Sequence, residues 1–530
     1  MYIIKSYILE GPFSMNSKLS NIGHKIFGTK PNDGDIQPIE GVAFGIAGFG
    51  QNLICTIIGS YLTIFMTDAI GFPALSVAFL MLFTRLFDAL NDPIMGSIVD
   101  RTRTKWGKCR PFLLWMPIPI AVMTILCFLP IYPNNPGGFA AISVVYVVWS
   151  VVYTIADVPY WGLSTAMTSN TVKRANMLTV ARLLCTAGAG LVTVIVPLIT
   201  GPISVQYGTD AGPRLANVYF IAAIILCVVA FPMFLFGFYK TRERMMSTDA
   251  PPSLKHNLKL LVKNKPLLLI VISGILGSAK MAYTYTGGLY FAKYVLADVF
   301  FLGMRGEQLY TIITMAAVPG GLVASLMVPW FAQRFGKRNT YIYSHIVGSL
   351  MMFVLFFVGI ANKSSLYTDP TTLIVGLISL VIIGIPMGFG NIITYAMIGD
   401  TVEYLELKTG ERAEGICFAM QTFINKIGMA VGAFIGVLAY YMADVTPNNP
   451  GALDPKGKDI MWIMLVLLGA ISLVGTAIPL FFYKFNEKNQ KAAIDIIMER
   501  RKLAEETGKT VQQIIAEETT DRVSEILTKK

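Results

Sequence analysis

Apolar runs of about twenty residues, separated by short polar segments, recur along the whole chain. Three of them, residues 267–289, 373–390 and 462–483, contain at most one charged residue each. A helix of that length crosses the roughly 30 Å hydrocarbon core of a bilayer, and these runs lack the polar face of a long soluble helix. The pattern predicts an all-α polytopic membrane protein with about twelve transmembrane helices in two bundles of six. The spans are expected at 41–66, 75–99, 112–130, 139–165, 179–200 and 216–239, and at 266–296, 308–332, 340–361, 371–398, 415–442 and 460–483.

The segments outside the two bundles complete the predicted organisation. It comprises an N-terminal segment (1–40), a first bundle (41–239), a central loop (240–265), a second bundle (266–483) and a tail (484–530). The apolar residues of the tail fit short amphipathic helices, and we expect this segment to be solvated. The start of the mature chain, at Met1 or Met15, stays open.

Charge is scarce and unevenly placed. Hydrophobic residues make up 54% of the chain and charged residues 14%, against about 25% charged residues in soluble domains. The formal net charge of +11 comes largely from short loops at 101–110, 173–174, 240–265 and 334–338. All four loops fall on one side of the predicted topology, which is the cytoplasmic side with both termini. The sequence therefore favours a multi-pass protein of the plasma membrane, which in a bacterium is the inner membrane. It does not favour a nucleic-acid-binding protein.

The two halves of the chain end their second spans alike. Span 2 is followed by Asp100–Arg103 and then Trp106–Lys108, whereas span 8 is followed by Gln333–Arg338. A basic Gly-Lys turn at the same place in each half indicates a parallel repeat, as in the major facilitator fold. An ordinary basic loop that sets membrane orientation would also explain it. We expect the functional unit to be a monomer in the lipid bilayer.

Span 2 contains charges where charges are costly. An ionisable side chain at mid-membrane costs about 2.5–3.5 kcal/mol on insertion scales and usually faces a cavity. Asp88 and Asp92 are four residues apart and therefore share a helix face, with Arg85 one turn earlier and Asn91 beside them. Hard cations such as Na⁺ bind oxygen ligands of this kind. A structural ion pair is the alternative, and for Arg85 the two interpretations are evenly balanced.

Span 4 combines an acid with aromatic rings on one stripe. Tyr153, Asp157 and Trp161 follow one another at spacings of four. A carboxylate accepts hydrogen bonds from hydroxyl groups, and a ring covers the apolar face of a sugar. Pro159 removes a backbone donor and exposes a carbonyl one turn earlier. The stripe is typical of a sugar-binding site.

Further polar residues lie inside other predicted spans. These are Arg182 in span 5, Lys280 in span 7, and Gln421, Thr422 and Lys426 in span 11. Structural ion pairs are again the alternative interpretation, and a lysine can also extend its ammonium group toward the membrane surface.

The longest of these motifs resemble a known family. Residues 85–96 (RLFDALNDPIMG), 153–161 (YTIADVPYW), 399–404 and 421–426 are similar to motifs of the glycoside–pentoside–hexuronide:cation symporters. The motifs occur in the correct order, and the resemblance covers roughly residues 40–485. It implies a major facilitator fold and a secondary transporter that works by alternating access.

The resemblance also implies roles for individual residues. It places a cation at Asp88, Asn91, Asp92 and Thr154, and a sugar at Asp157, Trp161 and Arg182. Lys426, with Gln421 and Thr422, links the two sites. The coupling cation implied is Na⁺, with H⁺ and Li⁺ as alternatives, and no other cofactor is expected.

The sequence departs from the family pattern in span 1. Where the family has Gly-Lys-Asp, this chain has Gly50-Gln51-Asn52, so an amide replaces a second sugar-binding acid. An amide still bonds to hydroxyl groups but does not repel an anion, and Lys280 adds a positive charge in the other half. We expect a preference for an acidic sugar, such as a hexuronide or glucuronide, or for a pentoside-containing glycoside.

Three other functions remain in view. A carrier of an amphiphile or drug would use the same fold, but the polar cluster of Asp157, Arg182 and Lys426 favours a hydrophilic solute. A membrane enzyme would need a nucleophile–base pair, a metal site or a phosphate loop, and no such spacing occurs. A non-transporting sensor would need an added signalling domain, for which the tail is short.

Overall fold

The computed structural model describes residues 36–168, 171–244, 254–284, 286–361, 370–411 and 414–517. Most of the predicted N-terminal segment (1–35), part of the central loop (245–253) and the end of the tail (518–530) lie outside the described residues, as does Met15.

Each of the twelve predicted spans coincides with a helix or with a run of consecutive helices. The first half contains α3 (Pro38–Thr56), η1 (Ile57–Tyr61), α4 (Leu62–Ile64), η2 (Phe65–Ile70), α5 (Ala74–Arg101), α6 (Arg110–Trp115), α7 (Pro117–Cys127), α8 (Pro136–Met167), α9 (Thr171–Tyr207), η3 (Gly208–Ala211) and α10 (Gly212–Lys240). The second half contains α12 (Lys265–Leu276), η4 (Ser278–Lys280), α13 (Met281–Thr284), α14 (Thr286–Tyr290), η5 (Phe291–Val295), α15 (Leu309–Phe335), α16 (Lys337–Ala361), α17 (Pro370–Thr409), α18 (Glu414–Met442), α19 (Pro455–Trp462), η8 (Ile463–Leu467) and α20 (Leu468–Phe481). The all-α class is confirmed.

The remaining elements are short or lie at the ends of the bundles. They are α11 (Leu254–Lys263), the hairpin of β1 (Phe300–Phe301) and β2 (Met304–Arg305), η6 (Gly306–Gln308), η7 (Pro450–Ala452), α21 (Glu487–Thr507) and α22 (Val511–Glu517).

The outer surface of the helices is apolar. Val144, Val228 and Leu326 are 63%, 66% and 82% exposed, and many other large apolar side chains face outward with them. An apolar surface of that extent is typical of a membrane-facing protein. Within the described residues, eight stretches are long and apolar enough to cross a bilayer, and one of them, Asn176–Lys240, includes two predicted spans.

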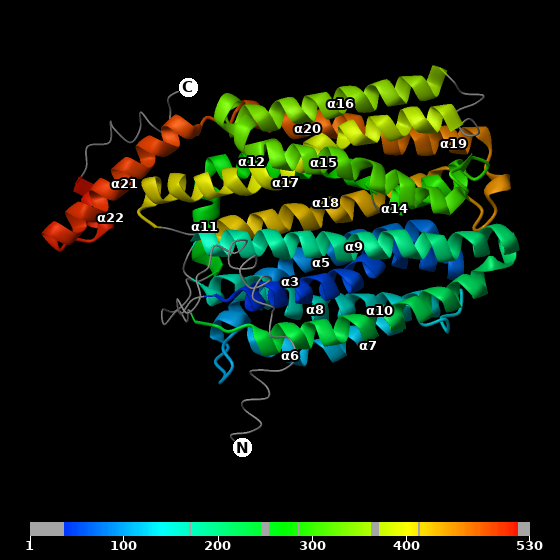
Figure 1. The fold of residues 1–530 in the computed structure, drawn as a ribbon, viewed down its shortest axis with the longest axis horizontal. Coiled ribbons are helices and arrows are strands. Elements are labelled where there is room, and N and C mark those ends of the chain that lie inside the picture. The colour runs from blue at the N-terminus through cyan, green and yellow to red at the C-terminus, as the bar shows by residue number, and fades with distance from the viewer. Residues whose placement is uncertain are drawn as a thin grey trace.

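The two halves of the chain form two layers of roughly parallel helices (Figure 1). The first half, coloured blue through teal to the green of α10 at the bottom, lies beneath the second half, coloured green to orange. The helices α5 and α18 pack against each other across this boundary, as do α9 and α15. Because α5 carries the acids of span 2 and α18 carries Lys426, this packing brings the charged residues of the two halves together.

Spans 1 and 7 both end in a π-helix. Span 1 ends in the π-helix η2, and span 7 ends in the π-helix η5. A π-turn adds a residue to the helical turn, and such turns occur often at functional sites. The correspondence places equivalent irregular segments in both halves, in agreement with a parallel repeat.

Part of the tail packs on the second bundle and is not free in solvent. Helix α17 has 40 residues, or about 60 Å at 1.5 Å per residue, so it extends well beyond a hydrocarbon core of about 30 Å. Ala493, Ile496 and Ile497 of α21 are buried there. Arg500 of α21 donates to the Leu407 carbonyl at 2.7 Å. The amphipathic helix thus finds its partner in the protruding end of α17.

Candidate functional site

The acids of span 2 are held by bases from both halves. On α5, Arg85 and Asp88 form a buried ion pair with an N–O distance of 3.4 Å. Asp92, one turn further along, accepts from the Lys426 ammonium of α18 at 2.5 Å. The first pair lies within one helix, whereas the second joins the two halves of the molecule.

Three polar atoms of the predicted cation set lack a protein partner. Within the described part of the chain, Asp88 Oδ1, Asn91 Nδ2 and Thr154 Oγ1 are buried and make no hydrogen bond. They belong to α5 and α8, which pack against each other. A buried polar atom without a partner costs about 1–3 kcal/mol, so such atoms mark a place where a ligand fits. Turning the Asn91 amide by half a turn presents its oxygen there as well.

The composition of this set suits a small monovalent cation. It offers a carboxylate, an amide and a hydroxyl, all of which present oxygen. Across the described residues, no group of three or more His, Cys, Asp or Glu side chains is arranged to hold a metal ion.

Asp157 is the centre of the predicted sugar set. The Gln51 amide of α3 donates to Asp157 Oδ1 at 2.5 Å, and the Trp161 indole of α8 donates to the same oxygen at 3.1 Å. Gln51 Nε2 also lies 3.3 Å from the Tyr153 hydroxyl. The predicted stripe is therefore one hydrogen-bonded group, and Gln51 joins it from span 1.

Arg182 of α9 lies between aromatic rings of both halves. Its guanidinium carbon is 4.1 Å from the centroid of the Trp161 ring and 5.7 Å from that of the Tyr395 ring. Arg182 Nη2 donates to the Tyr395 hydroxyl at 2.9 Å. Tyr395 belongs to α17, so this contact crosses from the first half to the second.

The carboxylates act on one another through a shared electrostatic field. Asp157 interacts with Lys426, Asp92 and Arg182, and Asp88 interacts with Lys426 and Asp92. The predicted cation and sugar sets therefore adjoin, with Lys426 common to both. Three acids face three bases in this cluster: Asp88, Asp92 and Asp157 against Arg85, Arg182 and Lys426.

Other predicted residues are placed differently. The Asn52 amide donates to the Gly48 carbonyl of its own helix at 2.9 Å. Gln421 donates to Asn425 at 3.2 Å, and the neighbouring Thr422 is exposed. Lys280 lies 3.2 Å from His345 Nε2, in a pocket that is otherwise lined by apolar side chains of the second bundle. The structure thus assigns Lys280 to the interior of that bundle.

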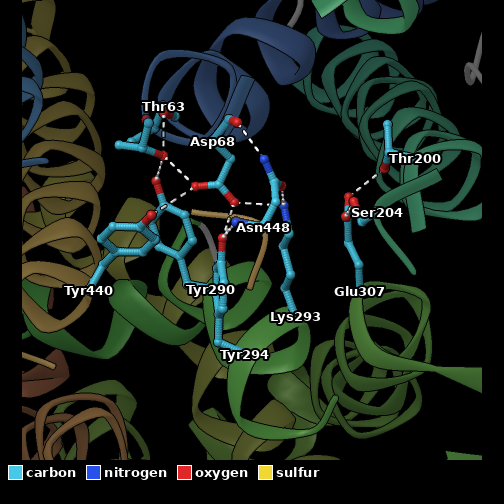
Figure 2. Close-up of polar contacts among 11 residues, drawn as sticks. Thr63, Asp68, Thr200, Ser204, Tyr290, Lys293, Tyr294, Glu307, Tyr440 and Asn448 are labelled. Carbon is cyan, nitrogen blue, oxygen red and sulfur yellow. Dashed lines mark hydrogen bonds and ion pairs between the residues drawn. The ribbon is translucent and has the colours of Figure 1, made fainter. Parts of the chain in front are cut away.

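A polar network at the end of the molecule opposite the basic loops was not predicted. In Figure 2, Asp68 of η2 lies at its centre. Its carboxylate accepts from Lys293 of η5 at 2.6 Å, from Tyr294 at 2.5 Å and from Tyr440 at 3.1 Å. Asn448 donates to the Asp68 carbonyl at 2.6 Å and accepts from Lys293 at 2.7 Å.

A second contact lies beside this network. The buried Glu307 carboxylate of η6 accepts from Thr200, and from Ser204 at 3.2 Å, both on α9 (Figure 2). Together, the Asp68 network and the Glu307 contact join the two halves at this end. The signal that sequence reasoning missed is an acid at the end of span 1 and a lysine at the equivalent end of span 7.

Comparisons with known proteins agree with this picture. The family model described as MFS/sugar transport protein matches residues 43–487. The chain is 29% identical to the isoprimeverose transporter of Lactiplantibacillus pentosus, over 86% of this chain and 91% of that protein. It is 28% identical to the glucuronide carrier protein homolog of Escherichia coli strain K12 (88% and 96%). It is 27% identical to the putative sulfoquinovose importer of Salmonella typhimurium (92% and 97%).

Solved structures share the fold at lower identity. The crystal structure of the nucleoside transporter NupG superposes with a TM-score of 0.55 at 16% identity, covering 84% of this chain and 100% of that one. A bacterial homologue of the human drug peptide transporters PepT1 and PepT2 gives a TM-score of 0.57 at 12% identity, covering 84% and 97%. These likenesses concern the architecture of the two bundles.

Proposed function

Because this chain belongs to the MFS/sugar transport protein family, we propose that it carries a sugar or glycoside together with a monovalent cation. The predicted resemblance and the major facilitator fold are confirmed, and the chain is a multi-pass membrane transporter and not an enzyme. The relatives named for isoprimeverose, glucuronide and sulfoquinovose all handle sugars or sugar derivatives. The cation, its site and its coupling to the sugar belong to the proposal.

The observation that carries the coupling is the position of Lys426. Its ammonium group binds Asp92, and it also acts electrostatically on Asp157 in the sugar set. A cation that binds beside Asp88 and Asp92 competes with Lys426 for the carboxylates. Release of Lys426 then changes the charge beside Asp157, so occupancy of one site alters the affinity of the other. The buried unpartnered oxygens of Asp88 and Thr154 support the cation position.

Alternating access supplies the transport step. The two bundles rock around the central site, so that it faces each side in turn. One cation that moves inward with a neutral sugar through 100 mV supplies about 2.3 kcal/mol, which corresponds to about 50-fold accumulation. With an acidic sugar the two charges cancel, and only the concentration gradient of the cation drives uptake. The polar contacts around Asp68 support a state that is closed at the end opposite the basic loops. With those loops in the cytoplasm, both termini are cytoplasmic and the closed end faces outward.

The substrate class follows from the charges near Asp157. Gln51 is neutral and donates to Asp157, and Asn52 is neutral where the family pattern has an acid. Arg182 adds a guanidinium group on the face of Trp161. We therefore propose an acidic sugar, with a hexuronide as the leading case and a pentoside-containing glycoside as the neutral alternative. The hydrogen-bonding groups around Asp157 suit hydroxyl groups and argue against an amphiphile.

The decisive experiment measures uptake into proteoliposomes with and without a Na⁺ gradient. The panel contains methyl β-D-glucuronide, methyl β-D-glucoside and isoprimeverose, with Li⁺ and H⁺ gradients in place of Na⁺. We expect Asp92→Asn to lose concentrative uptake at least 100-fold, because Lys426 then lacks its carboxylate, while downhill exchange persists. Asp495→Asn, on the exposed face of α21, is the matched control and should behave as wild type. Full accumulation by Asp92→Asn would contradict the coupling role.

A further inference from the structure

The position of Trp161 is determined within the first half of the molecule. Its indole nitrogen donates to Asp157 at 3.1 Å. The Tyr160 ring packs edge-on at a centroid distance of 4.9 Å and an angle of 72°, and the Phe44 ring does so at 6.4 Å and 81°. These contacts fix the plane of the indole, so the ring presents a defined face to whatever lies on it.

That face is covered by Arg182. A separation of 4.1 Å between the guanidinium carbon and the ring centroid is direct stacking contact. A sugar that stacks on Trp161 needs the same position for its apolar C–H groups. The guanidinium group and a sugar ring therefore exclude each other on this face, and a sugar can stack there only when Arg182 moves.

Tyr395 holds Arg182 in the covering position. It accepts from the guanidinium group at 2.9 Å, and its ring lies 5.7 Å from the guanidinium carbon. Tyr395 is on α17 of the second half, whereas Trp161 and Arg182 are on the first. The hydrogen bond therefore joins the two halves with the guanidinium group on the indole.

We propose that Tyr395 is a positioning residue for the sugar site, which holds Arg182 on Trp161 without substrate and releases it when a sugar ring takes its place. The inference rests on the proposed function. Displacement breaks the Arg182–Tyr395 hydrogen bond and frees the guanidinium group. A uronide compensates for the broken hydrogen bond, because its carboxylate accepts paired hydrogen bonds from the freed guanidinium group. A neutral glycoside offers no such acceptor, so the exchange favours acidic sugars.

The test is the affinity of Tyr395→Phe for two matched probes. Methyl β-D-glucuronide and methyl β-D-glucoside differ only at C6, where one has a carboxylate and the other a hydroxymethyl group. Titration calorimetry on purified protein in nanodiscs with Na⁺ gives the Kd of each. We expect Tyr395→Phe to bind both probes about threefold to tenfold more tightly, because the phenyl ring remains while the competing hydrogen bond is gone.

A double-mutant cycle shows whether Tyr395 acts through Arg182. In an Arg182→Gln background, the additional change Tyr395→Phe should leave both Kd values unchanged. Tyr343→Phe, on an outward-facing tyrosine that is 57% exposed on α16, is the control and should match wild type. A melting curve for each variant verifies folding.

The outcomes separate the two proposals. Wild-type protein that binds neither probe nor isoprimeverose overturns the proposed function and this inference with it. Wild-type binding together with an unchanged or weaker Kd in Tyr395→Phe overturns the inference alone, since a weaker Kd identifies Tyr395 as a direct sugar contact. A tighter Kd that persists in the Arg182→Gln background also overturns it, because Tyr395 then acts without Arg182.

Discussion

Span 1 contributes two neutral amides, Gln51 and Asn52, and no acid to the predicted sugar set. Gln51 uses its amide group to bond to Asp157, whereas Asn52 bonds to the Gly48 carbonyl of its own helix. Neither adds a negative charge beside Asp157. A carboxylate at position 52 could not donate to the Gly48 carbonyl, and it would add a negative charge one residue from Gln51.

This reasoning predicts the effect of Asn52→Asp. For an assumed separation of about 10 Å and an effective dielectric constant of about 20, two like charges repel by about 1.7 kcal/mol, which is on the order of tenfold in affinity. We expect the KM for methyl β-D-glucuronide uptake to rise about tenfold, and that for methyl β-D-glucoside to change less than twofold. Asn52→Ser, which adds no charge, is the control. Equal changes for the two probes would show that position 52 does not select by charge.

At the residue scale, the sequence identified the charges but not their neutral partners. Asp88, Asp92, Asp157 and Lys426 stand out because an ionisable group inside a membrane is costly. The sequence contains 23 tyrosines, and nothing about Tyr395 distinguishes it from the others. Its role depends on a contact between α9 and α17, and only the folded chain brings these helices together.

At the scale of the elements, the π-helices η2 and η5 bring a buried acid and a buried lysine into contact. Asp68 and Lys293 occupy equivalent ends of spans 1 and 7, and their side chains are 0% and 3% exposed. Removal of one partner of such a pair leaves an uncompensated buried charge, at a cost of about 3–5 kcal/mol. Opening this end of the molecule to water would relieve that cost.

We therefore expect Lys293→Met to shift the protein toward a state that is open at this end. Spin labels at Asp210 and Lys456, which are exposed on the first and second halves, report the separation by pulsed electron resonance. The distance distribution should move to longer values in Lys293→Met. The double variant Asp68→Asn, Lys293→Met removes both charges and should return part of the population to the short distance. An unaltered distribution in Lys293→Met would exclude a closing role for the pair.

The sequence predicted the helices well and their ends poorly. Span 1 was expected to end at residue 66, but the helical run continues to Ile70 and includes Asp68. Span 10 was expected to end at residue 398, whereas α17 continues to Thr409 and receives α21. An apolar run ends where polar residues begin, so the hydropathy pattern does not reveal the part of a helix that extends beyond the membrane. The amphipathic pattern of α21 likewise does not identify its partner.

At the scale of the whole molecule, the charged side chains of the site balance one another. Three acids and three bases face one another between the bundles, so their formal charges cancel. A net charge buried in a low dielectric is costly during the rocking step. One bound cation makes the site positive, and one bound uronide restores neutrality. The charge balance therefore favours a single cation carried with a single acidic sugar.

The stoichiometry can be measured from the response to a membrane potential. The proposed cation site contains the buried unpartnered atoms of Asp88, Asn91 and Thr154, and we expect it to take one cation in each cycle. Uptake of methyl β-D-glucuronide with one Na⁺ then moves no net charge, whereas uptake of methyl β-D-glucoside moves one positive charge.

In proteoliposomes with a K⁺ diffusion potential of about 100 mV, negative inside, accumulation of the glucoside should rise by up to about 50-fold. Accumulation of the glucuronide should not respond, and the ratio of ²²Na⁺ to sugar should be one for both. A glucuronide accumulation that increases with the potential would mean that a second cation moves, and the single site between α5 and α8 could not then account for coupling.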